Sequence, residues 1–596
     1  MPTHAPRPVR HLAAALAGAA LLALAAPAAA VTLAVTRLDD PAPDGCFPND
    51  CSLREAVILA NALAGADTVV LGAGMFQLTR AGAGEDAGLT GDLDVAGPLT
   101  IQGAGRTQTT IVGVTLGDRL LDASADLDVR DLGLEGGVAS SDWGGGLRAG
   151  RNLTLERVTI ANNSADRGGG VAWMTNGWTL SVRDSSFSGN AAIFAGGGIA
   201  MLAGAARVER STFSANTASA QGGGGILVMN TNPGATAWLE LVDSVFELNT
   251  ADAGGAVASW SGAPYPNDPE AGVRLRVVRS TFTLNTAWGT GGAISFWRQG
   301  YGGAEQLLEV EEGAFDRNSS GSAGGAVAVG VGRAVIDGAE LVGNTAPSGG
   351  GLYVGPEIGP ASAQVFRSSF VDNDAVSGSG GGVYSRGGLE VRRSSFVGNT
   401  AALDGGGVLA GGGTVVARST FSANQAAGAG GGLWAGDALV QVFASTFRAN
   451  TAGSGGAALH GGATTFGNQL RYSGNVISGT CGGGAFVYVT DGWNVESPGA
   501  TCAPFGAATG DLLSVSDGSL GLGALQTDGR TWFYVPGAGS VVRDRAAACA
   551  DVDQRGYVAG DSACDGGSIE VGATFPSFFD DGFETGLGAW SASQGG

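Results

Sequence analysis

The sequence predicts an all-β fold, a right-handed, single-stranded parallel β-helix, and two observations support this prediction. The first is a repeat of the form S-x-F-x-x-N-x-A, followed by a glycine run and an aliphatic residue, as in residues 211–226. The second is that the 107 glycines of the 596 residues recur with this repeat and are interleaved with aliphatic residues. Self-similarity at such a period is the signature of a solenoid.

The aromatic and asparagine positions recur at nearly constant spacing. Successive asparagines lie 25 to 29 residues apart, except for three gaps of 33, 36 and 33. In three units another apolar residue takes the aromatic position: Ile160 with Asn163, Leu341 with Asn344 and Tyr472 with Asn475. The nine units with phenylalanine are Phe187/Asn190, Phe213/Asn216, Phe246/Asn249, Phe282/Asn285, Phe315/Asn318, Phe370/Asn373, Phe396/Asn399, Phe421/Asn424 and Phe447/Asn450.

Each repeat has three apolar positions, which predict three short strands. An aliphatic residue precedes the aromatic one by five positions, and another follows the glycine run, as Val208 and Ile226 do around Phe213. Alternation within each segment has period two, and the parity breaks between segments, where bends must lie. Three strands and three bends make one coil of a β-helix. An α-helical solenoid is excluded, because each glycine of the runs would cost about 1 kcal/mol relative to alanine.

Stacked coils predict ladders of like residues. The phenylalanines and aliphatic residues should form two ladders inside the β-helix. Asparagine should line one bend, because it tolerates left-handed backbone angles and its amide can bond the asparagines above and below. These repeated residues are therefore predicted to build the scaffold rather than an active site.

Charge and hydropathy restrict the partners. The formal net charge of -22 argues against nucleic acid and anionic membranes as partners. It permits calcium, but no calcium motif is present, so we predict no cofactor and no metal ligands. We predict no transmembrane span in the mature chain, because no stretch after residue 30 reaches about 18 apolar residues. We also predict a monomer.

The chain divides into six segments. Residues 1–30 have two arginines, an Ala/Leu-rich core and a small-residue end, which predicts a secretory signal cleaved before Val31. Cysteines are expected to pair in an oxidising compartment, and sequential pairing gives Cys46–Cys51, Cys481–Cys502 and Cys549–Cys564 among fifteen possibilities. The other segments are an amino-terminal cap (31–70), irregular coils (71–142), regular coils (143–475), a carboxyl-terminal cap (476–575) and a tail (576–596).

The amino-terminal cap contains a recognisable motif. Ser52 and Glu55 fit a capping box that begins a short helix. C-S-L-R-E-A at 51–56, followed by A-N-A at 60–62, resembles the CSLREA-type amino-terminal domain of exported bacterial proteins. This resemblance implies secretion and a capping role, with β-helix repeats behind the cap, but it implies no reaction.

Two further resemblances concern the repeats and the carboxyl end. The F-x-x-N and G-G-A-[ILV] elements, as at 282–285 and 291–294, resemble the repeats of polymorphic outer-membrane proteins. Those repeats form a pectin-lyase-like β-helix and imply adhesion. L-x-x-L-Q-x-x-G, P-G-x-x-S, D-Q-R-G and C-D-x-G-x-x-E, between 522 and 570, resemble a choice-of-anchor region, although Ser568 stands where that family usually has alanine. The D-G-F-E-T-G run at 581–586 resembles a sorting tail.

The sequence shows no catalytic signature. Enzymes with this fold act on polysaccharides through carboxylates, and hydrolysis needs a pair about 5–9.5 Å apart. Asp316, Asp404 and the pair Asp372/Asp374 are isolated acids, and His460, the one histidine after the leader, stands beside glycines at a strand end. We therefore predict no catalytic residues.

The three long gaps predict the ligand site. Their additional residues all enter between the strand after the glycine run and the next strand, so three consecutive coils should carry loops at one corner. Nearby aromatic residues should point outward by strand parity and form one stripe. Such a stripe indicates a ligand, or else a flap made by the loops themselves. The predicted ligand-binding residues are Trp260, Tyr265, Trp297, Tyr301, Tyr353, Tyr384 and Trp434.

These observations predict an exported or surface-located binding or adhesion protein, directed towards a glycan or a cell surface. The first alternative is a polysaccharide lyase or glycoside hydrolase that acts on the β-helix. The second is a structural spacer without a ligand, which would need no exposed aromatic residues. A structure that brought carboxylates and an arginine together beside the long loops would favour the enzyme.

Overall fold

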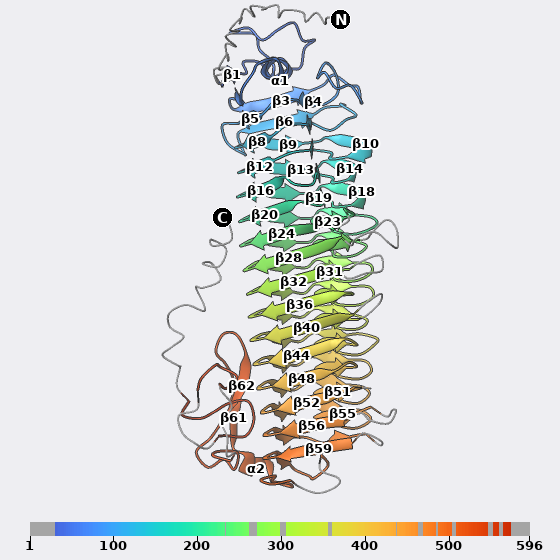
Figure 1. The fold of residues 1–596 in the computed structure, drawn as a ribbon, viewed down its shortest axis with the longest axis vertical. Coiled ribbons are helices and arrows are strands. Elements are labelled where there is room, and N and C mark those ends of the chain that lie inside the picture. Colours follow the sequence, from blue (N-terminus) through green and yellow to red (C-terminus); the bar gives the residue numbers. More distant parts are fainter. Residues whose placement is uncertain are drawn as a thin grey trace, which may run out of the picture.

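The computed structural model describes residues 30–232, 234–261, 271–297, 306–355, 360–436, 438–462, 469–483, 487–502, 508–545, 552–558 and 564–573. Over these residues the chain winds into a parallel β-helix (Figure 1), which confirms the predicted fold class. Each coil stacks on the one before, and the strands form four long parallel sheets of 17, 16, 12 and 15 strands. We number these sheets 1 to 4 in the order in which one coil visits them.

One coil near the middle of the rod illustrates the path of the chain. The next coil begins with β28 (Gly272–Val278), which pairs in register with the first strand of this one. Side chains alternate between the interior and the outside along each strand. The coil consists of β24 (Thr236–Val242) in sheet 1, β25 (Val245–Glu247) in sheet 2, β26 (Thr250–Ala251) in sheet 3 and β27 (Val257–Ser261) in sheet 4.

The structure has four strands in a coil where the sequence predicted three. The additional strand belongs to sheet 3 and has only two residues in most coils, such as Thr250 and Ala251. Two residues cannot display an alternating pattern, so the sequence gives no strand signal there. The three predicted apolar positions lie in the other sheets, as Leu241, Phe246 and Val257 show.

The predicted phenylalanine ladder lies inside the β-helix. The rings from Phe187 to Phe315 stack on one another with centroids 4.5–5.0 Å apart and nearly parallel planes. A second run from Phe370 to Phe447 has spacings of 4.6–4.9 Å. Leu341 pairs with a phenylalanine on either side and separates the two runs. All these side chains are buried.

The asparagine ladder lies between sheets 2 and 3. Asn249 donates its side-chain amide to Oδ1 of Asn285 in the next coil at 3.0 Å and to the Phe213 carbonyl of the previous coil at 2.9 Å. The predicted amide ladder is thus confirmed. The predicted left-handed backbone is displaced by one residue, because Leu248 rather than Asn249 has a positive φ of 57°. This bend leaves the asparagine side chain aimed along the stack.

The last predicted unit of the repeat is wrong. Tyr472 pairs with Val442 of sheet 1, whereas Ile477 pairs with Phe447 and so takes the ladder position. Asn475 accepts the Ser445 N–H at Oδ1, 2.9 Å away, in the position that serine occupies elsewhere. Tyr472 and Asn475 therefore have the spacing of the F-x-x-N element, but Tyr472 lies in sheet 1 and Asn475 lies at the bend that follows sheet 1.

The corner between sheets 1 and 2 carries a column of alternating charges. Arg157, Arg210 and Arg279 each pair with an aspartate of the preceding coil, at 2.6–2.8 Å. These residues share a left-handed backbone with φ between 45° and 55°. In order along the rod the column is Asp131, Arg157, Asp184, Arg210, Asp243 and Arg279. We refer to it as the corner column.

The amino-terminal end of the rod is covered by α1 (Leu53–Ala62), seen at the top of Figure 1. Ser52 and Glu55 form the predicted capping box, and the apolar side of α1 joins the interior of the first coils. The predicted Cys46–Cys51 disulfide is present, with Cα atoms 4.2 Å apart. In the described ranges no helix combines the length and the apolar character that crossing a membrane requires.

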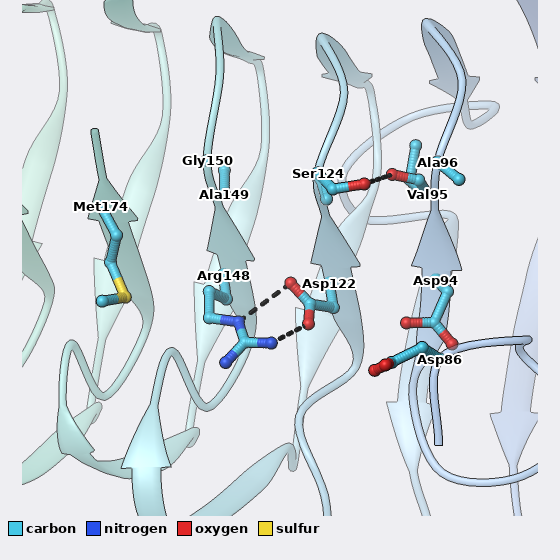
Figure 2. A pocket seen from close by; sticks show the side chains of 11 residues that line it. Asp86, Asp94, Val95, Ala96, Asp122, Ser124, Arg148, Ala149, Gly150 and Met174 are labelled. Atoms are coloured by element: carbon cyan, nitrogen blue, oxygen red, sulfur yellow. Dashed lines mark hydrogen bonds and ion pairs between the residues drawn. The ribbon is translucent and has the colours of Figure 1, made fainter. Parts of the chain in front are cut away.

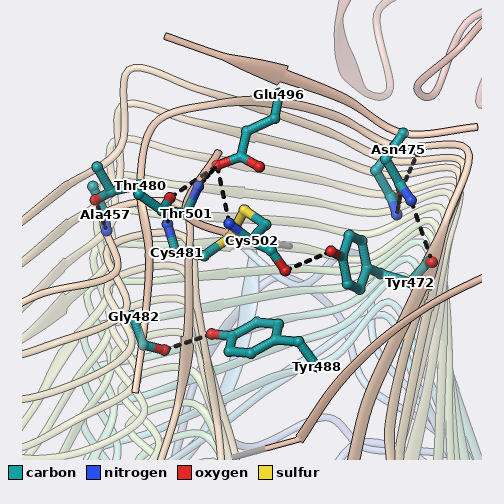
Figure 3. The surroundings of a disulfide bond; sticks show 11 residues. Ala457, Tyr472, Asn475, Thr480, Cys481, Gly482, Tyr488, Glu496, Thr501 and Cys502 are labelled. Carbon is teal, nitrogen blue, oxygen red and sulfur yellow. Dashed lines mark hydrogen bonds between the residues drawn. A yellow bond between two sulfur atoms is a disulfide. The ribbon is translucent and has the colours of Figure 1, made fainter. Parts of the chain in front are cut away.

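The carboxyl-terminal end holds the second predicted disulfide, Cys481–Cys502 (Figure 3). β60 (Val495–Ser497) places Glu496 opposite Ile477, so a carboxyl group ends the ladder of ring positions. Glu496 accepts the backbone N–H groups of Thr501 and Cys502. The third predicted pair cannot be followed, because Cys549 lies outside the described residues.

Glu496 predicts a pH dependence of stability. The residue is 1% exposed, its Oε2 atom has no hydrogen-bond partner among the described residues, and burial raises the pKa of its carboxyl group. A raised folded-state pKa stabilises the fold below the unfolded pKa of about 4.3, and this contribution is lost as the pH rises through the folded pKa. We expect Glu496→Gln to melt like the wild type at pH 4 and at a higher temperature than the wild type at pH 8, as measured by circular dichroism.

A matched control for this prediction is Asp491→Asn, since Asp491 is partly exposed and pairs with Arg471 at 2.9 Å. Unlike Glu496→Gln, Asp491→Asn should not raise the melting temperature above that of the wild type when the pH increases from 4 to 8. A Glu496→Gln effect of the same size at both pH values would contradict the assignment of a raised pKa.

The chain then turns back along the outer face of sheet 2 (Figure 1). After α2 (Asp517–Leu520), β61 (Leu522–Thr527) and β62 (Trp532–Pro536) form an antiparallel pair. Tyr534 hydrogen-bonds Ser422 at 2.7 Å, and Gln554 hydrogen-bonds Thr420 at 2.7 Å. The carboxyl-terminal region therefore packs beside the last coils as well as beyond them.

Candidate functional site

Sheet 4 presents two rows of outward side chains. In β27, Ala258 and Trp260 point outward, and their equivalents in other coils define a first and a second row. The first row is Asp94, Asp122, Arg148, Ala172, Ala200, Leu227, Ala258, Ser295, Ala328, Tyr353, Tyr384, Leu409, Trp434 and His460. The second is Ala96, Ser124, Gly150, Met174, Leu202, Met229, Trp260, Trp297, Gly330, Gly355, Arg386, Gly411, Gly436 and Gly462.

The predicted aromatic residues divide between these rows. Trp260 and Trp297 belong to the second row, whereas Tyr353, Tyr384 and Trp434 belong to the first. The predicted stripe therefore occupies two neighbouring rows, both outward by parity, and the large side chains change rows after Trp297. The other two predicted residues, Tyr265 and Tyr301, lie outside the described residues.

Trp260 is part of an apolar cluster on the outer face. It packs against a cluster formed by Leu227, Met229 and Ala258 of sheet 4 together with Ala195 of β18 (Ala191–Ala195) in sheet 3. These four residues are buried although they lie outside the coil. Trp260 therefore packs on outward apolar side chains of the β-helix and is only partly exposed.

Trp297 and Trp434 lie against glycines of the second row. A Cβ atom at Gly330 would come within 2.4 Å of the Trp297 ring. Cβ atoms at Gly436 and Gly462 would come within 2.8 and 2.6 Å of the Trp434 ring. Glycine is needed at these positions because only it lets a ring approach the backbone so closely. Both indoles thus rest on the sheet and remain partly exposed.

Tyr353 and Tyr384 lie between the two tryptophans and stack on each other. Their ring centroids are 5.2 Å apart and their planes differ by 9°. Arg386 donates from Nε to the Tyr384 hydroxyl at 2.6 Å. Because each ring covers a face of the other, this pair offers edges and hydroxyl groups rather than a flat platform.

The sequence contains a signal for this arrangement that the prediction did not use. Two residues after an outward ring or leucine there is a glycine, in Y-V-G at 353–355, L-A-G at 409–411 and W-A-G at 434–436. Strand parity places both residues on the same face. A large side chain beside a glycine on one face predicts a ring that lies along the strand.

The first coils carry a cleft of about 480 Å³ on the same sheet (Figure 2). It lies over β4 (Leu93–Val95), β7 (Leu121–Ala123) and β11 (Leu147–Ala149). Asp94, Asp122 and Arg148 of the first row line it, together with Asp86 from a loop and Met174 from the second row. The structure therefore brings carboxylates and an arginine together at the amino-terminal coils. Most of two long loops, residues 262–270 and 298–305, lies outside the described ranges.

Two arginines distribute the negative charge of this cleft unequally. Arg148 donates from Nε to Asp122 at 3.0 Å. Arg119 donates to both Asp122 and Asp92, at 3.2 Å in each case. Among the described residues no arginine or histidine pairs with Asp94, which accepts the Gly88 N–H at 2.8 Å. Burial, followed by repulsion from neighbouring aspartates, raises the pKa of Asp92 to about 7, and burial raises that of Asp94 to about 6.

The amino-terminal helix positions β4 beneath the cleft. Arg54, on α1, donates to the carbonyl groups of Gly88, Gly91 and Asp92 at 2.8–3.0 Å. Asn61 donates to the Asp94 carbonyl at 2.7 Å. Both residues belong to the motif that resembles the CSLREA-type domain, so the part of the chain predicted as a cap also builds one wall of the cleft.

Three carboxyl groups have a spacing that a cation could use. Asp92, Asp94 and Asp122 each place an oxygen within 4.8 Å of the other two. Calcium prefers such oxygen ligands. However, Asp92 and Asp122 already pair with arginines, with which a cation would compete. The sequence permits calcium but contains no motif for it.

Comparison with known proteins gives a limited result. No family model matches the chain, and no curated protein matches it. The resemblances to CSLREA-type and polymorphic outer-membrane proteins therefore stay predictions. Among solved structures the chain is similar to the A-module of the mannuronan C-5 epimerase AlgE6 of Azotobacter vinelandii. The match has 17% identity, covers 74% of this chain and 95% of that one, and has a TM-score of 0.32, too low to support a functional argument.

Proposed function

We propose that this protein binds an extended glycan on the outer face of sheet 4 and that it is exported to do so. The observation that carries the proposal is the position of Trp434, whose partly exposed indole rests on Gly436 and Gly462. An indole held in this way offers one face to the backbone and the other to a ligand. Two disulfides in the described chain support export, since they persist in oxidising compartments.

A glycan suits this surface for physical reasons. Pyranose rings have apolar faces that pack on aromatic rings, and their hydroxyl groups need polar partners at the edge. Here Arg386 and the Tyr384 hydroxyl supply such partners beside the indoles. Because the glycines fix the ring against the sheet, little side-chain entropy is lost when a ligand binds. A spacer without a ligand would need neither the rings nor the glycines.

The proposal predicts that Trp434→Ala loses most of its retention on insoluble polysaccharides, while its melting temperature changes little. The removed ring lies outside the coil, so the interior packing is kept. Retention is measured by pull-down and affinity electrophoresis with cellulose, xylan and chitin. Binding that survives Trp434→Ala at wild-type strength would contradict the proposal.

The matched control is Trp238→Ala. Trp238 is 45% exposed and lies on β24 in sheet 1, away from the proposed surface. It should retain polysaccharides as the wild type does. Equal losses in both variants would indicate nonspecific aromatic adsorption.

A second candidate function is glycoside cleavage in the cleft. Asp94 and Asp122 place oxygens within 4.8 Å of each other, near the spacing of retaining glycosidases, and their surroundings differ. Asp94, with its raised pKa, would protonate the glycosidic oxygen, and Asp122 would attack the anomeric carbon. The test is release of reducing ends from the retained polysaccharide by the wild type and its loss in Asp94→Asn. If the wild type releases none, binding alone remains.

A further inference from the structure

Resting on the proposed function, we infer that the ligand is an uncharged, extended pyranose polymer that lies parallel to the long axis of the β-helix. It would advance by about one sugar per coil and contact Trp297 and Trp434 at the same time. Three features support this inference: the interval between the two indoles, the glycine positions between them, and the scarcity of charge along both rows.

The second row is continuous between the two tryptophans. Gly330, Gly355, Arg386, Gly411 and Gly436 each donate the backbone N–H to a carbonyl group of the preceding coil, so their register is kept. Five coils separate Trp297 from Trp434, which corresponds to about 24 Å at the spacing of neighbouring strands. Each sugar of an extended chain covers nearly one such spacing, so about six sugars would reach both indoles.

A polymer lying across the rod would not meet both platforms. β31 (Ile294–Phe296) and β51 (Leu433–Ala435) have three residues each. A strand of this length spans only about 10 Å. A crosswise chain would therefore leave sheet 4 after contacting one indole, and only the axial direction links the two.

Charge selects against acidic polymers. From Ser295 to Gly462, Arg386 is the only arginine, lysine or carboxylate side chain in the two rows. A polyuronate carries one negative charge per sugar and would need a series of cations at the same interval. Towards the amino-terminal end the same face carries Asp94, which pairs with no arginine among the described residues, and the whole chain has a formal charge of -22. Repulsion would therefore increase along an anionic chain.

Gly411 allows a test that leaves both indoles in place. Its backbone does not have a positive φ, and an added Cβ atom would meet the Ser385 carbonyl oxygen at 3.1 Å and otherwise Arg386 atoms at 3.5–3.6 Å. A longer side chain there would project outward between the platforms. Gly411→Gln should therefore block a chain that runs from one indole to the other without removing either.

The experiment is calorimetric titration with xylo-oligosaccharides and cello-oligosaccharides of three and six units, on the full chain. We expect two weak sites for the trisaccharides and one site for the hexasaccharides, at least tenfold tighter, because the second contact is intramolecular. Trp297→Ala should leave one trisaccharide site and remove the hexasaccharide advantage. Gly411→Gln should remove that advantage and keep both trisaccharide sites. Melting curves confirm that each variant is folded.

The outcomes separate this inference from the proposed function. If Trp434→Ala loses polysaccharide retention but three and six sugars bind equally well, the glycan surface stands and the axial arrangement is overturned. Tighter binding of hexagalacturonate than of the neutral hexasaccharides would overturn the uncharged class. If the wild type retains no polysaccharide and binds neither length, the proposed function itself is lost.

Discussion

Arg54→Met is expected to lower the free energy of unfolding by about 3–5 kcal/mol, because removing one partner of a buried ion pair leaves the other charge uncompensated. The Arg54 and Asp40 side chains are 0% and 1% exposed, and the Nε–Oδ1 distance is 2.7 Å. The substitution also removes the donors to three backbone carbonyl groups of residues 88–92. The measurement is chemical denaturation followed by circular dichroism.

A double-mutant cycle with Asp40→Asn tests the reason for this effect. Asp40 also accepts the backbone N–H groups of Thr79 and Arg80, which asparagine can still accept. If the buried charge dominates, Arg54→Met should cost much less in the Asp40→Asn background. Strictly additive effects would show instead that the carbonyl contacts, rather than the ion pair, hold α1 to the loop.

Phe282→Ala is expected to destabilise the rod by about 3–5 kcal/mol, as other buried aromatic deletions do. Phe282 is 0% exposed, and its ring stacks between Phe246 and Phe315 at 5.0 and 4.9 Å. The truncation leaves a cavity that the neighbouring coils cannot close, because the asparagine ladder fixes their spacing. Unfolding should begin at this coil, since each repeat contacts only its neighbours. Hydrogen exchange at residues 246–318 measures this locally.

Phe282→Leu is the matched control. Leu341 already occupies the ring position between Phe315 and Phe370 and is fully buried there. The leucine variant should therefore lose clearly less stability than the alanine variant. If both melt like the wild type, the ladder does not carry local stability.

The regular coils could be predicted because equivalent residues occupy equivalent positions in every coil. One phenylalanine, one asparagine and one glycine run per coil give a period that determines the stacking of Phe213 under Phe246 and of Asn249 under Asn285. The two-residue strands of sheet 3 could not be predicted, because a pair of residues has no alternation. At Tyr472 a chance F-x-x-N-like spacing gave a wrong register, which only strand pairing corrects.

The candidate site was harder to predict than the scaffold. The cleft depends on Asp94, Asp122 and Arg148, which follow one another in register, but the first coils lack the phenylalanine and glycine signals that would reveal this. Asp92 and Arg119 lie beside it through loop geometry that no periodic pattern encodes. For the tryptophans, strand parity and the distance from the glycine-run aliphatic residue indicated outward positions, but they did not indicate that the rings would lie flat on glycines of the neighbouring coil.

The corner column constrains how the rod can change its length. Deleting the single coil that holds Asp184 would bring Arg157 against Arg210, whereas deleting that coil and the next would place Arg157 against Asp243. These pairs are partly exposed, so each favourable or unfavourable contact amounts to less than about 1 kcal/mol. Recombination between repeats would therefore be tolerated best when coils are gained or lost in twos. In this part of the chain the charge pattern therefore repeats every two coils, although the structure repeats every coil.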